Sequence, residues 1–517
     1  MLLKYSVLLI ARLSIISLRS DAESSWRPEW AVRLIALQED SGVMSGRYQQ
    51  NMTDTQSAVL YPGAPDLEFG PDGTGKVILG LDDPSYEFTE LIDVVAGSGG
   101  TLYVAGLGAN VTNDIDEYLV YAVKQNGDLD VSFGQNGKLR GQFHNQEGVN
   151  IKSSIHRIFY IEAQGEIPAK LLMLGRVGIP TGTERHWYPA LARYTLDGQL
   201  DSTFGELGTG LAIFAGLEGS QLGSDASEGM LGSKAKGAPY AGLVHSGYRL
   251  TGLRHNDRIY IAFPDPSYGH SIISFFDDGR VDWRFGTDGI LKLYDLSAPK
   301  PGMPLGAEVK AIYPSDGKLL LAGQLYKEGY VPFAGFVRIT LEGDIDTSFG
   351  RQGFQFGPGD QYELVWDIIP AFGRSFLTAG MGRNSTVNSS VYAIDQNGLP
   401  DPDFNNGNVL VVPGAPYSGT YLQLWDFGDR VLALGICNEL LAPHERLLLA
   451  RFLPDGSLDK SFGLPNAEGE GAGWQIYPSD YISALTRMVV VGDRIYVTGR
   501  IPQGAQSRFA CLACLKV

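Results

Sequence analysis

The amino-acid sequence predicts an all-β fold, a single seven-bladed β-propeller built from about seven four-stranded repeats. Two observations lead to this prediction. A short turn returns seven times along the chain, and short apolar strands without helical periodicity run between its copies. The composition agrees, because 66 glycines and 25 tyrosines among 517 residues suit many strands joined by tight turns.

Each copy of the turn is marked by a phenylalanine, preceded by a glycine six residues earlier and by an aspartate three residues earlier. The phenylalanines are Phe69, Phe133, Phe204, Phe285, Phe349, Phe404 and Phe462. The glycines are Gly63, Gly127, Gly198, Gly279, Gly343, Gly398 and Gly456. The aspartates are Asp66, Asp130, Asp201, Asp282, Asp346, Asp401 and Asp459. Spacings of 55 to 81 residues are too long and too uneven for a β-solenoid and fit one propeller blade per copy.

The chemistry of the turn indicates a structural corner. Asn or Asp before the glycine suits a tight turn with positive φ, and the aspartate can accept hydrogen bonds from backbone N–H groups ahead of it. We expect the phenylalanine to be buried between neighbouring repeats. Arg193, Arg338 and Arg451 each precede a turn glycine by five residues and are expected to pair with the repeated aspartates.

A repeated calcium site is the alternative reading of the turn. The stretch from Asp401 to Asn405 resembles the opening of a calcium loop, but it lacks the glycine and the carboxylate that such a loop needs at its sixth and twelfth positions. The other six copies do not carry the pattern. The sequence therefore favours a structural corner, with no metal site and no cofactor predicted.

Taken together, the pattern [Asp/Asn]-Gly-x-[apolar]-Asp-x-[Ser/Thr]-Phe-Gly-x-x-Gly resembles the delta-60 repeat, a propeller-type repeat found mostly in bacterial proteins, many of them surface-associated or secreted. The resemblance extends from Gly63 to the C-terminus, and Phe133, Phe204, Phe349 and Phe462 match best. It departs at Asn405 and after Gly463. The resemblance implies a propeller and a bacterial source, and it brings no catalytic residues with it.

The first 51 residues lie outside the repeat, so the sequence predicts a leader or non-native upstream segment over 1–51 and a propeller over 52–517. The segment starts like a signal peptide, but Arg12 and Arg19 interrupt its apolar region and no small-residue cleavage site precedes Ser24. A secreted or envelope protein is one reading. A cytoplasmic protein that starts at Met44 or Met52 is the other.

Charge and cysteine content limit the partners. The net charge of −17 makes nucleic acid a poor partner, and the apolar run near the N-terminus is too short for a membrane span. Cys511 and Cys514 have the spacing of a redox or metal pair, but they lie on a predicted strand, where residues three apart face opposite sides. Together with Cys437 they are expected to be buried thiols. The expected state of the protein is a monomer.

Two irregular segments are candidates for contacts. An insertion over residues 214–246 is rich in Gly, Ser and Ala and is expected to form a mobile loop on one face, either a lid or a tolerated insertion. A shorter excursion carries His186, Trp187 and Tyr188, whose aromatic rings are expected to be exposed for contact.

Sequence motifs of catalysis are absent. The chain contains no Gly-x-Ser-x-Gly, no His-Glu-x-x-His, no phosphate-binding loop with Lys-Ser/Thr and no dinucleotide fingerprint. The nearest group of histidines, His245, His255 and His270, has no metal-ligand spacing. An active site assembled from separate blades would escape such a search.

Positions that differ between blades are the better candidates for function. Thirteen residues before the strand-ending glycines Gly106, Gly323, Gly380 and Gly499 lie Asp93, Lys310, Asp367 and Thr486. We expect these polar residues to gather at the mouth of the central channel as a ligand site. The favoured function is non-enzymatic binding of a ligand or partner. The alternatives are a glycan-acting hydrolase or lyase with carboxylates at the channel mouth, and a scaffold for protein assembly.

Overall fold

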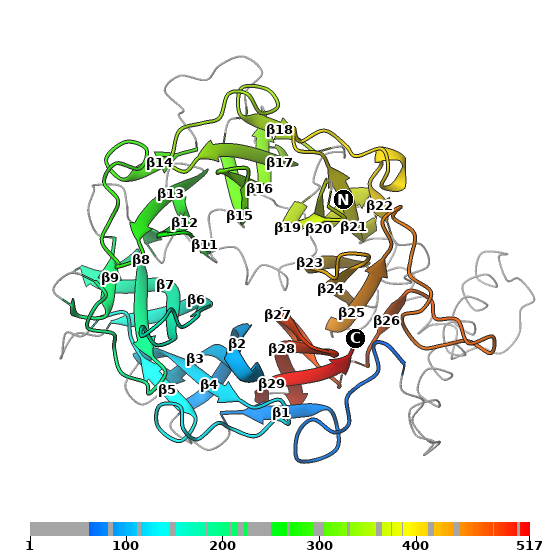
Figure 1. Ribbon diagram of the computed structural model, residues 1–517, viewed down its shortest axis with the longest axis horizontal. Helices are drawn as coiled ribbons and strands as arrows, with labels where there is room; N and C mark the ends of the chain where they lie inside the picture. Colours follow the sequence, from blue (N-terminus) through cyan, green and yellow to red (C-terminus); the bar gives the residue numbers. More distant parts are fainter. Residues whose placement is uncertain are drawn as a thin grey trace, which may run out of the picture. The chain divides into compact units, whose positions relative to one another are not determined.

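The computed structural model describes residues 61–80, 86–110, 115–144, 151–181, 184–205, 208–214, 222–224, 250–265, 269–293, 304, 306–327, 331–357, 364–373, 375–384, 386–411, 418–438, 445–478, 480–503 and 507–517. The compact unit Tyr61–Val517 is a seven-bladed β-propeller (Figure 1). The fold class predicted from the sequence is therefore confirmed. The domain boundary predicted at residue 51 lies outside the described residues.

Each blade is an antiparallel sheet whose first strand lies nearest the centre of the ring (Figure 1). Blade 1 contains β2 (Tyr86–Ala96), β3 (Leu102–Asn110), β4 (Ile115–Val123) and β5 (Lys138–Gly141). Blade 2 contains β6 (Lys152–Ile161), β7 (Lys170–Thr181), β8 (Glu184–Thr195) and β9 (Leu211–Ile213). Blade 3 contains β11 (Thr251–His255), β12 (Arg258–Asp265), β13 (Gly269–Phe276) and β14 (Ile290–Lys292). Blade 4 contains β15 (Gly306–Ser315), β16 (Lys318–Lys327), β17 (Val331–Thr340) and β18 (Phe354–Phe356).

The remaining blades follow the same plan. Blade 5 contains β19 (Leu364–Ala371), β20 (Ser375–Asn384), β21 (Thr386–Ile394) and β22 (Leu410–Val411). Blade 6 contains β23 (Ser418–Asp426), β24 (Val431–Asn438), β25 (Glu445–Phe452) and β26 (Trp474–Ile476). Blade 7 contains β27 (Ser483–Val491), β28 (Arg494–Gln503), β29 (Ser507–Lys516) and, from the start of the propeller, β1 (Lys76–Leu79). Short 3₁₀ turns occur at Ser98–Gly100 and Asn405–Gly407.

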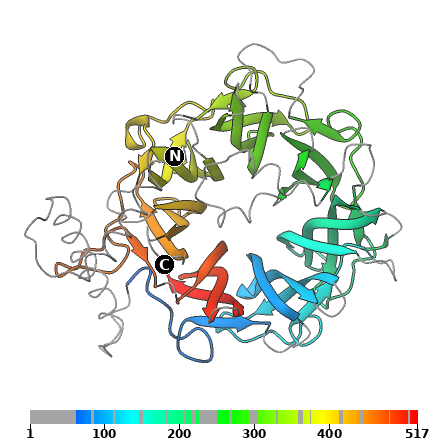
Figure 2. The same ribbon diagram turned by 180° about the vertical axis from the view of Figure 1, so that it is seen from behind.

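Blade 7 closes the ring by combining the two ends of the propeller (Figure 1, Figure 2). β1 pairs antiparallel with β29, with Lys76 opposite Ala513 and Leu79 opposite Ala510. Along the chain, a short strand follows each marker turn, as β1 follows the corner of Phe69. In the structure that strand is the outermost strand of the preceding blade, because only this pairing lets the first such strand join the last blade.

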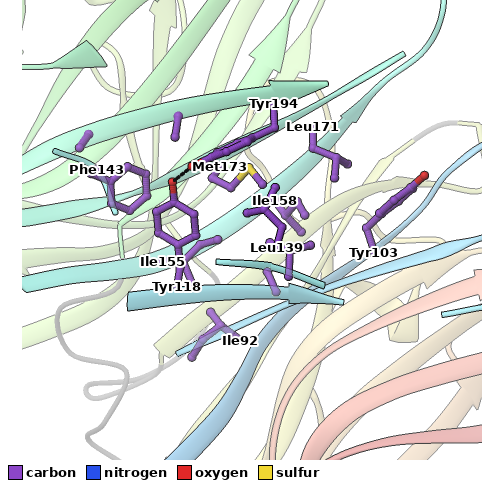
Figure 3. Close-up of a cluster of buried hydrophobic side chains, with 14 of the residues drawn as sticks. Ile92, Tyr103, Tyr118, Leu139, Phe143, Ile155, Ile158, Leu171, Met173 and Tyr194 are labelled. Carbon is purple, nitrogen blue, oxygen red and sulfur yellow. Dashed lines mark hydrogen bonds between the residues drawn. The ribbon is translucent and has the colours of Figure 1, made fainter. Parts of the chain in front are cut away.

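Apolar side chains fill the space between neighbouring blades. Figure 3 shows the layer between blades 1 and 2, in which Ile92, Tyr118, Ile155 and Met173 are almost completely buried. The hydroxyl groups of Tyr118 and Tyr194 form a hydrogen bond of 2.7 Å within this layer. Burial of these side chains is the main source of stability, since each contributes about 1.5–3 kcal/mol.

The seven marker turns form equivalent corners between the third and fourth strands of the blades. All seven glycines take positive φ, from +84° at Gly398 to +94° at Gly63 and Gly127. Each marker phenylalanine is buried. Each aspartate accepts a hydrogen bond from the backbone N–H two residues ahead, as Asp201 does from Thr203 at 3.0 Å. The equivalent bonds go to Asp66, Asp130, Asp282, Asp346, Asp401 and Asp459.

Basic side chains hold several corner aspartates. Nε of Arg193 lies 2.6 Å from Oδ2 of Asp201, and the same pair recurs as Arg338–Asp346 at 2.6 Å and Arg451–Asp459 at 2.8 Å. In blades 3 and 7 the arginine comes from the second strand instead, as Arg258–Asp282 and Arg494–Asp66. Sequence counting from the glycine did not find these two, because they lie on a different strand.

The corners also join neighbouring blades. The backbone N–H of Gly205, directly after its marker phenylalanine, donates to the carbonyl of Asp278 in the next corner at 2.7 Å. Gly70 donates to Asn126 and Gly286 donates to Glu342 in the same way. Asn405, which replaces the glycine in the sixth corner, takes positive φ and keeps this bond to Asp455. The substitution therefore leaves the corner intact.

Other sequence expectations have mixed outcomes. Cys437, Cys511 and Cys514 are buried free thiols, as predicted, and burial raises the pKa of Cys511 and of Cys514 to about 12. Most of the insertion over 214–246 lies outside the described residues, apart from β10 (Leu222–Ser224), which pairs with β8. Within the part of the chain that is described, no three His, Cys, Asp or Glu residues group as a metal site. No helix there is long and apolar enough to cross a membrane.

Candidate functional site

A common position on the innermost strand of every blade forms a ring around the centre of the propeller, here called the inner ring. In blade 1 it is Asp93, which lies opposite Ala105, the residue before Gly106. This glycine lies within β3, so the expectation that it ends the strand is wrong. The register of the other blades gives the full inner ring as Asp93, Arg157, Thr251, Ala311, Asp367, Gln423 and Arg487. Unlike the corners, these seven positions differ widely in charge and size.

The inner strands carry a local irregularity at this level. The register shifts at Ile92, His156, Lys310, Trp366 and Leu422, each directly before the inner-ring position. A β-bulge of this kind changes the direction in which side chains leave the strand, and bulges often occur next to functional sites.

The structure places only part of the predicted site on the inner ring. Asp93 and Asp367 belong to it, whereas Lys310 and Thr486 lie one residue earlier, at the bulge. Counting thirteen residues back from a glycine fails because the hairpin turns differ in length. β19 ends at Ala371 and β20 begins at Ser375, but β15 ends at Ser315 and β16 begins at Lys318, which makes the turn in blade 4 one residue shorter.

Asp93 and Arg157 form an ion pair across the boundary of blades 1 and 2. Nε of Arg157 lies 3.2 Å from Oδ2 of Asp93, which also accepts the backbone N–H of Ile158 at 3.0 Å. The other oxygen of Asp93 accepts the N–H of Val94 at 3.0 Å. The aspartate side chain is 4% exposed and the arginine 27%, so the carboxylate lies beneath a guanidinium that remains partly open.

Asp367 carries the second carboxylate of the inner ring. Its Oδ2 accepts the backbone N–H of Leu424 in blade 6 at 2.9 Å. Burial raises the pKa of Asp367 above its ordinary value, against the opposing charges of Arg487 in blade 7 and Arg157 in blade 2. Arg157 belongs to blade 2, three blades away from Asp367 in blade 5 (Figure 1).

Several side chains at or next to the inner ring form hydrogen bonds to the backbone of a neighbouring blade. Gln423 accepts the N–H of Met488 at 2.7 Å and donates to the carbonyl of the same residue at 3.0 Å. Asp93 and Asp367 make the corresponding bond to the next blade. The hydroxyl of Thr486 donates to the carbonyl of Leu91 at 3.0 Å, which joins blade 7 to blade 1. Thr486 therefore stabilises the closure of the ring.

Lys310 belongs to a separate charged cluster beside blade 4. Its Nζ pairs with Glu308 and lies 5.0 Å from the centre of the Trp366 ring in blade 5. The hydroxyl of Tyr326 donates to the other oxygen of Glu308 at 2.9 Å. Although burial opposes it, the charges of Lys310 and His270 lower the pKa of Glu308 below its ordinary value.

The aromatic excursion in blade 2 differs from its sequence prediction. His186, Trp187 and Tyr188 lie on β8, opposite β7 and next to β10. Trp187 is buried, so the expectation of an exposed ring is wrong for this residue. It packs in the layer between blades 2 and 3, with the guanidinium of Arg176 4.2 Å from its ring centre. His186 and Tyr188 are half-buried.

Sequence reasoning missed Arg157 and Arg487, which supply the positive charge of the inner ring. A signal was present in the sequence. Around the inner ring, the polar residue is flanked by buried apolar residues two before and one after, as in Ile155-His156-Arg157-Ile158 and Leu485-Thr486-Arg487-Met488. Alignment on these apolar neighbours, instead of on the distant glycine, finds the same position in six blades; in blade 3 the sequence Arg249-Leu250-Thr251-Gly252 does not carry the pattern.

Comparison with known proteins supports the architecture. A family described as a domain of unknown function (DUF5122) beta-propeller matches residues 187–204, 315–349 and 444–462, which contain the markers Phe204, Phe349 and Phe462. The chain is similar to a β-propeller repeat family. No curated protein sequence matches it.

The similar solved structures are distant. Trypanosoma rangeli sialidase has 11% identity and a TM-score of 0.35, with 86% of this chain and 58% of that chain covered. Drosophila Semaphorin 1b, extracellular domains 1–2, has 9% identity and a TM-score of 0.34, covering 86% of both chains. An endo-arabinase from Bacteroides thetaiotaomicron has 12% identity and a TM-score of 0.29, covering 52% of this chain and 93% of that chain. The chain thus spans under two thirds of the sialidase, and TM-scores this low carry no argument about its function.

Proposed function

We propose that this chain is a non-enzymatic binding propeller that recognises a ligand at the inner ring. The observation behind the proposal is the contrast between equivalent positions. All seven corners keep the same glycine, aspartate and phenylalanine, whereas the inner ring carries two acids, two arginines and three uncharged residues. Repeated residues hold the fold, so a set that varies around a common centre is the natural place for recognition.

The carboxylates near the centre favour binding over catalysis. Acid–base catalysis by two carboxyl groups needs one that is kept protonated beside one that stays ionised. Asp93 is paired with Arg157 and two backbone N–H groups, and Glu308 with Lys310 and Tyr326. Asp367 has a raised pKa, but its oxygen accepts the backbone N–H of Leu424. These carboxylates are engaged in ion pairs and hydrogen bonds within the protein, which does not favour acid–base catalysis by them.

The exposed apolar side chains do not favour the scaffold alternative. A protein-assembly surface would show a contiguous apolar patch. The large exposed apolar residues at the corners include Leu67, Val131, Trp283 and Leu399, and each belongs to the corner of a different blade. Single apolar residues spread around a ring are normal for a soluble protein.

A ligand screen with ring variants tests the proposed function. The full-length protein is screened by thermal shift against neutral sugars, sugar acids, amino acids and short peptides, and each hit is incubated and analysed by mass spectrometry. The proposal predicts a hit that is recovered unchanged and that is lost in Asp93→Asn/Asp367→Asn. Arg280→Gln, an exposed change at a corner, is the matched control and should keep binding. Conversion of the hit to a product, or equal binding by the ring variant, would overturn the proposal.

A further inference from the structure

Blade 3 is joined to both of its neighbours by buried histidines. Nδ1 of His156 in blade 2 accepts the backbone N–H of Leu250, directly before β11, at 2.6 Å. Nδ1 of His270 in blade 3 accepts the backbone N–H of Val309 in blade 4 at 3.2 Å. The two histidines are 6% and 5% exposed. Each histidine therefore links the innermost strand of one blade to the blade before it.

These bonds determine the protonation state of both rings. A backbone N–H can only donate, so Nδ1 of each ring is the unprotonated nitrogen and the proton of the neutral ring lies on Nε2. Nε2 of His156 lies 3.2 Å from Oγ of Ser154, which can accept a hydrogen bond from it. An imidazolium carries a proton on both nitrogens and has no acceptor. Protonation of either ring therefore breaks its bond to the next blade.

The corresponding bonds at other junctions do not depend on a neutral ring. Oε1 of Gln423 in blade 6 accepts the backbone N–H of Met488 in blade 7 at 2.7 Å. Asp93 makes the same kind of bond to Ile158 at 3.0 Å. An amide does not titrate, and a carboxyl group keeps an acceptor oxygen even when it is protonated. The junctions on the two sides of blade 3 therefore differ from these in their response to acid.

The charged groups next to His270 centre on one carboxylate. Although burial opposes it, the charges of Lys310 and His270 hold the pKa of Glu308 below its ordinary value, so this carboxylate stays ionised in mild acid and favours a charged ring. Lys310 and the hydroxyl of Tyr326 are both bonded to Glu308. The residue opposite His270 on β12 is a proline, and the exposed Lys292 of β14 pairs with the residue after His270, which faces the other side of the sheet.

The charged neighbours of His156 are arginines. The guanidinium of Arg176 on β7 lies 4.2 Å from the centre of an indole ring, and Arg157 pairs with Asp93 of blade 1. Arg254 on β11 pairs with a carboxylate of its own blade. Burial and positive neighbours both disfavour a further cation, so His156 takes up a proton mainly when the junction opens.

We propose that blade 3 is an acid-sensitive segment of the ring, in which protonation of His156 and His270 releases the innermost strands of blades 3 and 4 from the blades before them. An ordinary histidine is about 90% protonated at pH 5.5. A proton that binds only the open junction therefore makes opening about tenfold more frequent at this pH than at neutral pH. The release requires no ligand at the inner ring.

Hydrogen–deuterium exchange of the full-length protein at pH 7.5 and pH 5.5, corrected for the intrinsic pH dependence of exchange, tests the proposal. Peptides that contain Leu250 and Val309 are expected to lose about tenfold in protection at pH 5.5. The peptide that contains Met488 is the internal control, because its N–H is held by an amide. Its protection should change by less than about twofold.

Variants then assign the effect to the histidines. In His156→Asn/His270→Asn the amide oxygen stands close to the position of Nδ1 and accepts at every pH, so protection at Leu250 and Val309 should change by less than about threefold between the two conditions. His255→Asn, at a half-buried histidine of β11, is the matched control and should keep the response of the wild type. Melting temperature at pH 7.5 verifies that both variants are folded. If the double variant does not fold, the comparison of Leu250 and Val309 with Met488 in the wild type decides.

The proposal is overturned if either Leu250 or Val309 keeps its protection at pH 5.5, or if Met488 loses protection to the same extent. An equal acid response in the wild type and in the folded double variant would also overturn it. The proposed binding function is independent of these outcomes, since the ligand screen measures it separately.

Discussion

Two arginines of blade 2, Arg193 and Arg157, form arginine–aspartate pairs that look alike and do different things. At the corner, Arg193 bonds Asp201 through Nε at 2.6 Å, and its other nitrogens donate to Thr203 and to the carbonyl of Asp277 in blade 3. At the inner ring, Arg157 bonds Asp93 through Nε at 3.2 Å, and its other nitrogens have no such use among the described residues. All three guanidinium nitrogens of Arg193 donate hydrogen bonds within the fold, whereas Arg157 donates such a bond only through Nε among the described residues.

The difference separates residues that stabilise the fold from residues whose side chains are partly exposed at the centre of the ring. The corner arginine is 8% exposed and recurs in other blades, with its guanidinium stacked 4.6 Å from the centre of the Phe204 ring. The inner-ring arginine Arg157 is 27% exposed, and five of the other six inner-ring positions carry uncharged or acidic residues. Repetition and complete pairing occur together at the corner, and variation and incomplete pairing occur together at the centre.

The largest expected effect is at the corner. Asp201→Ala leaves the buried guanidinium of Arg193 and the ammonium of Lys170 without their carboxylate, which should lower the free energy of unfolding by about 3–5 kcal/mol. Urea denaturation at pH 7 measures this. Asp278→Ala, in an exposed pair, should change it by less than about 1 kcal/mol.

Acid titration sharpens the same prediction. Although burial alone would raise it, hydrogen bonds from Lys170 and Thr203 and the charge of Arg193 hold the pKa of Asp201 well below its ordinary value. A lowered pKa in the folded state gives stability that is full above about pH 4 and is lost as the pH falls below it. The loss in Asp201→Ala should therefore shrink towards low pH. A loss that is the same at pH 3 and pH 7 would contradict the role assigned to the ion pair.

The next effect concerns the close contact between neighbouring corners. A Cβ on Gly279 would lie 2.8 Å from Cζ of Phe204 and 2.9 Å from the backbone nitrogen of Gly205, at a φ of +86°. Gly279→Ala should therefore cost about 2–3 kcal/mol, through both backbone strain and collision. Gly317→Ala also has positive φ, +71°, but its Cβ would meet nothing within 4 Å, so it should cost about 1 kcal/mol. Equal losses of unfolding free energy in the two variants would show that the close contact between neighbouring corners does not contribute to stability.

The smallest expected effect is at the inner ring, and it has the opposite sign. Since burial raises the pKa of Asp367, the ionised carboxylate destabilises the fold as the pH rises through its folded-state pKa. Asp367→Asn, which keeps an acceptor for Leu424, should raise the stability at pH 7 by about 1 kcal/mol and have little effect near pH 4. Asp93→Asn is the comparison, because it weakens an ion pair and should not stabilise. Stabilisation by Asp93→Asn, or none by Asp367→Asn, would contradict this description of the ring.

The sequence predicted the fold and the corners because both depend on local spacing. Gly198, Asp201 and Phe204 lie within seven residues, so their relation survives any change in loop length elsewhere. The pairing of Arg193 with Asp201 was also within reach, since the two residues are eight apart on one hairpin.

The residues of the inner ring and the pairing that closes the propeller could not be predicted from local spacing. Whether Lys310 or Ala311 reaches the inner ring depends on a single residue in the β15–β16 turn, and a shift of one residue reverses the side to which a strand residue points. The pairing of β1 with β29 joins residues more than 400 apart. Trp187 is buried because blade 3 packs against blade 2, a contact that no local pattern contains.

The central claim, that corners hold the fold and the inner ring binds, is tested most directly by comparing Arg193→Gln with Arg157→Gln in one blade. For each variant, the free energy of unfolding and the affinity for the ligand found in the thermal-shift screen are measured together. We predict a loss of about 3 kcal/mol of stability for Arg193→Gln, and for Arg157→Gln a loss of at most about 1 kcal/mol with binding weakened about tenfold. A large loss of stability in Arg157→Gln with affinity unchanged would contradict the claim.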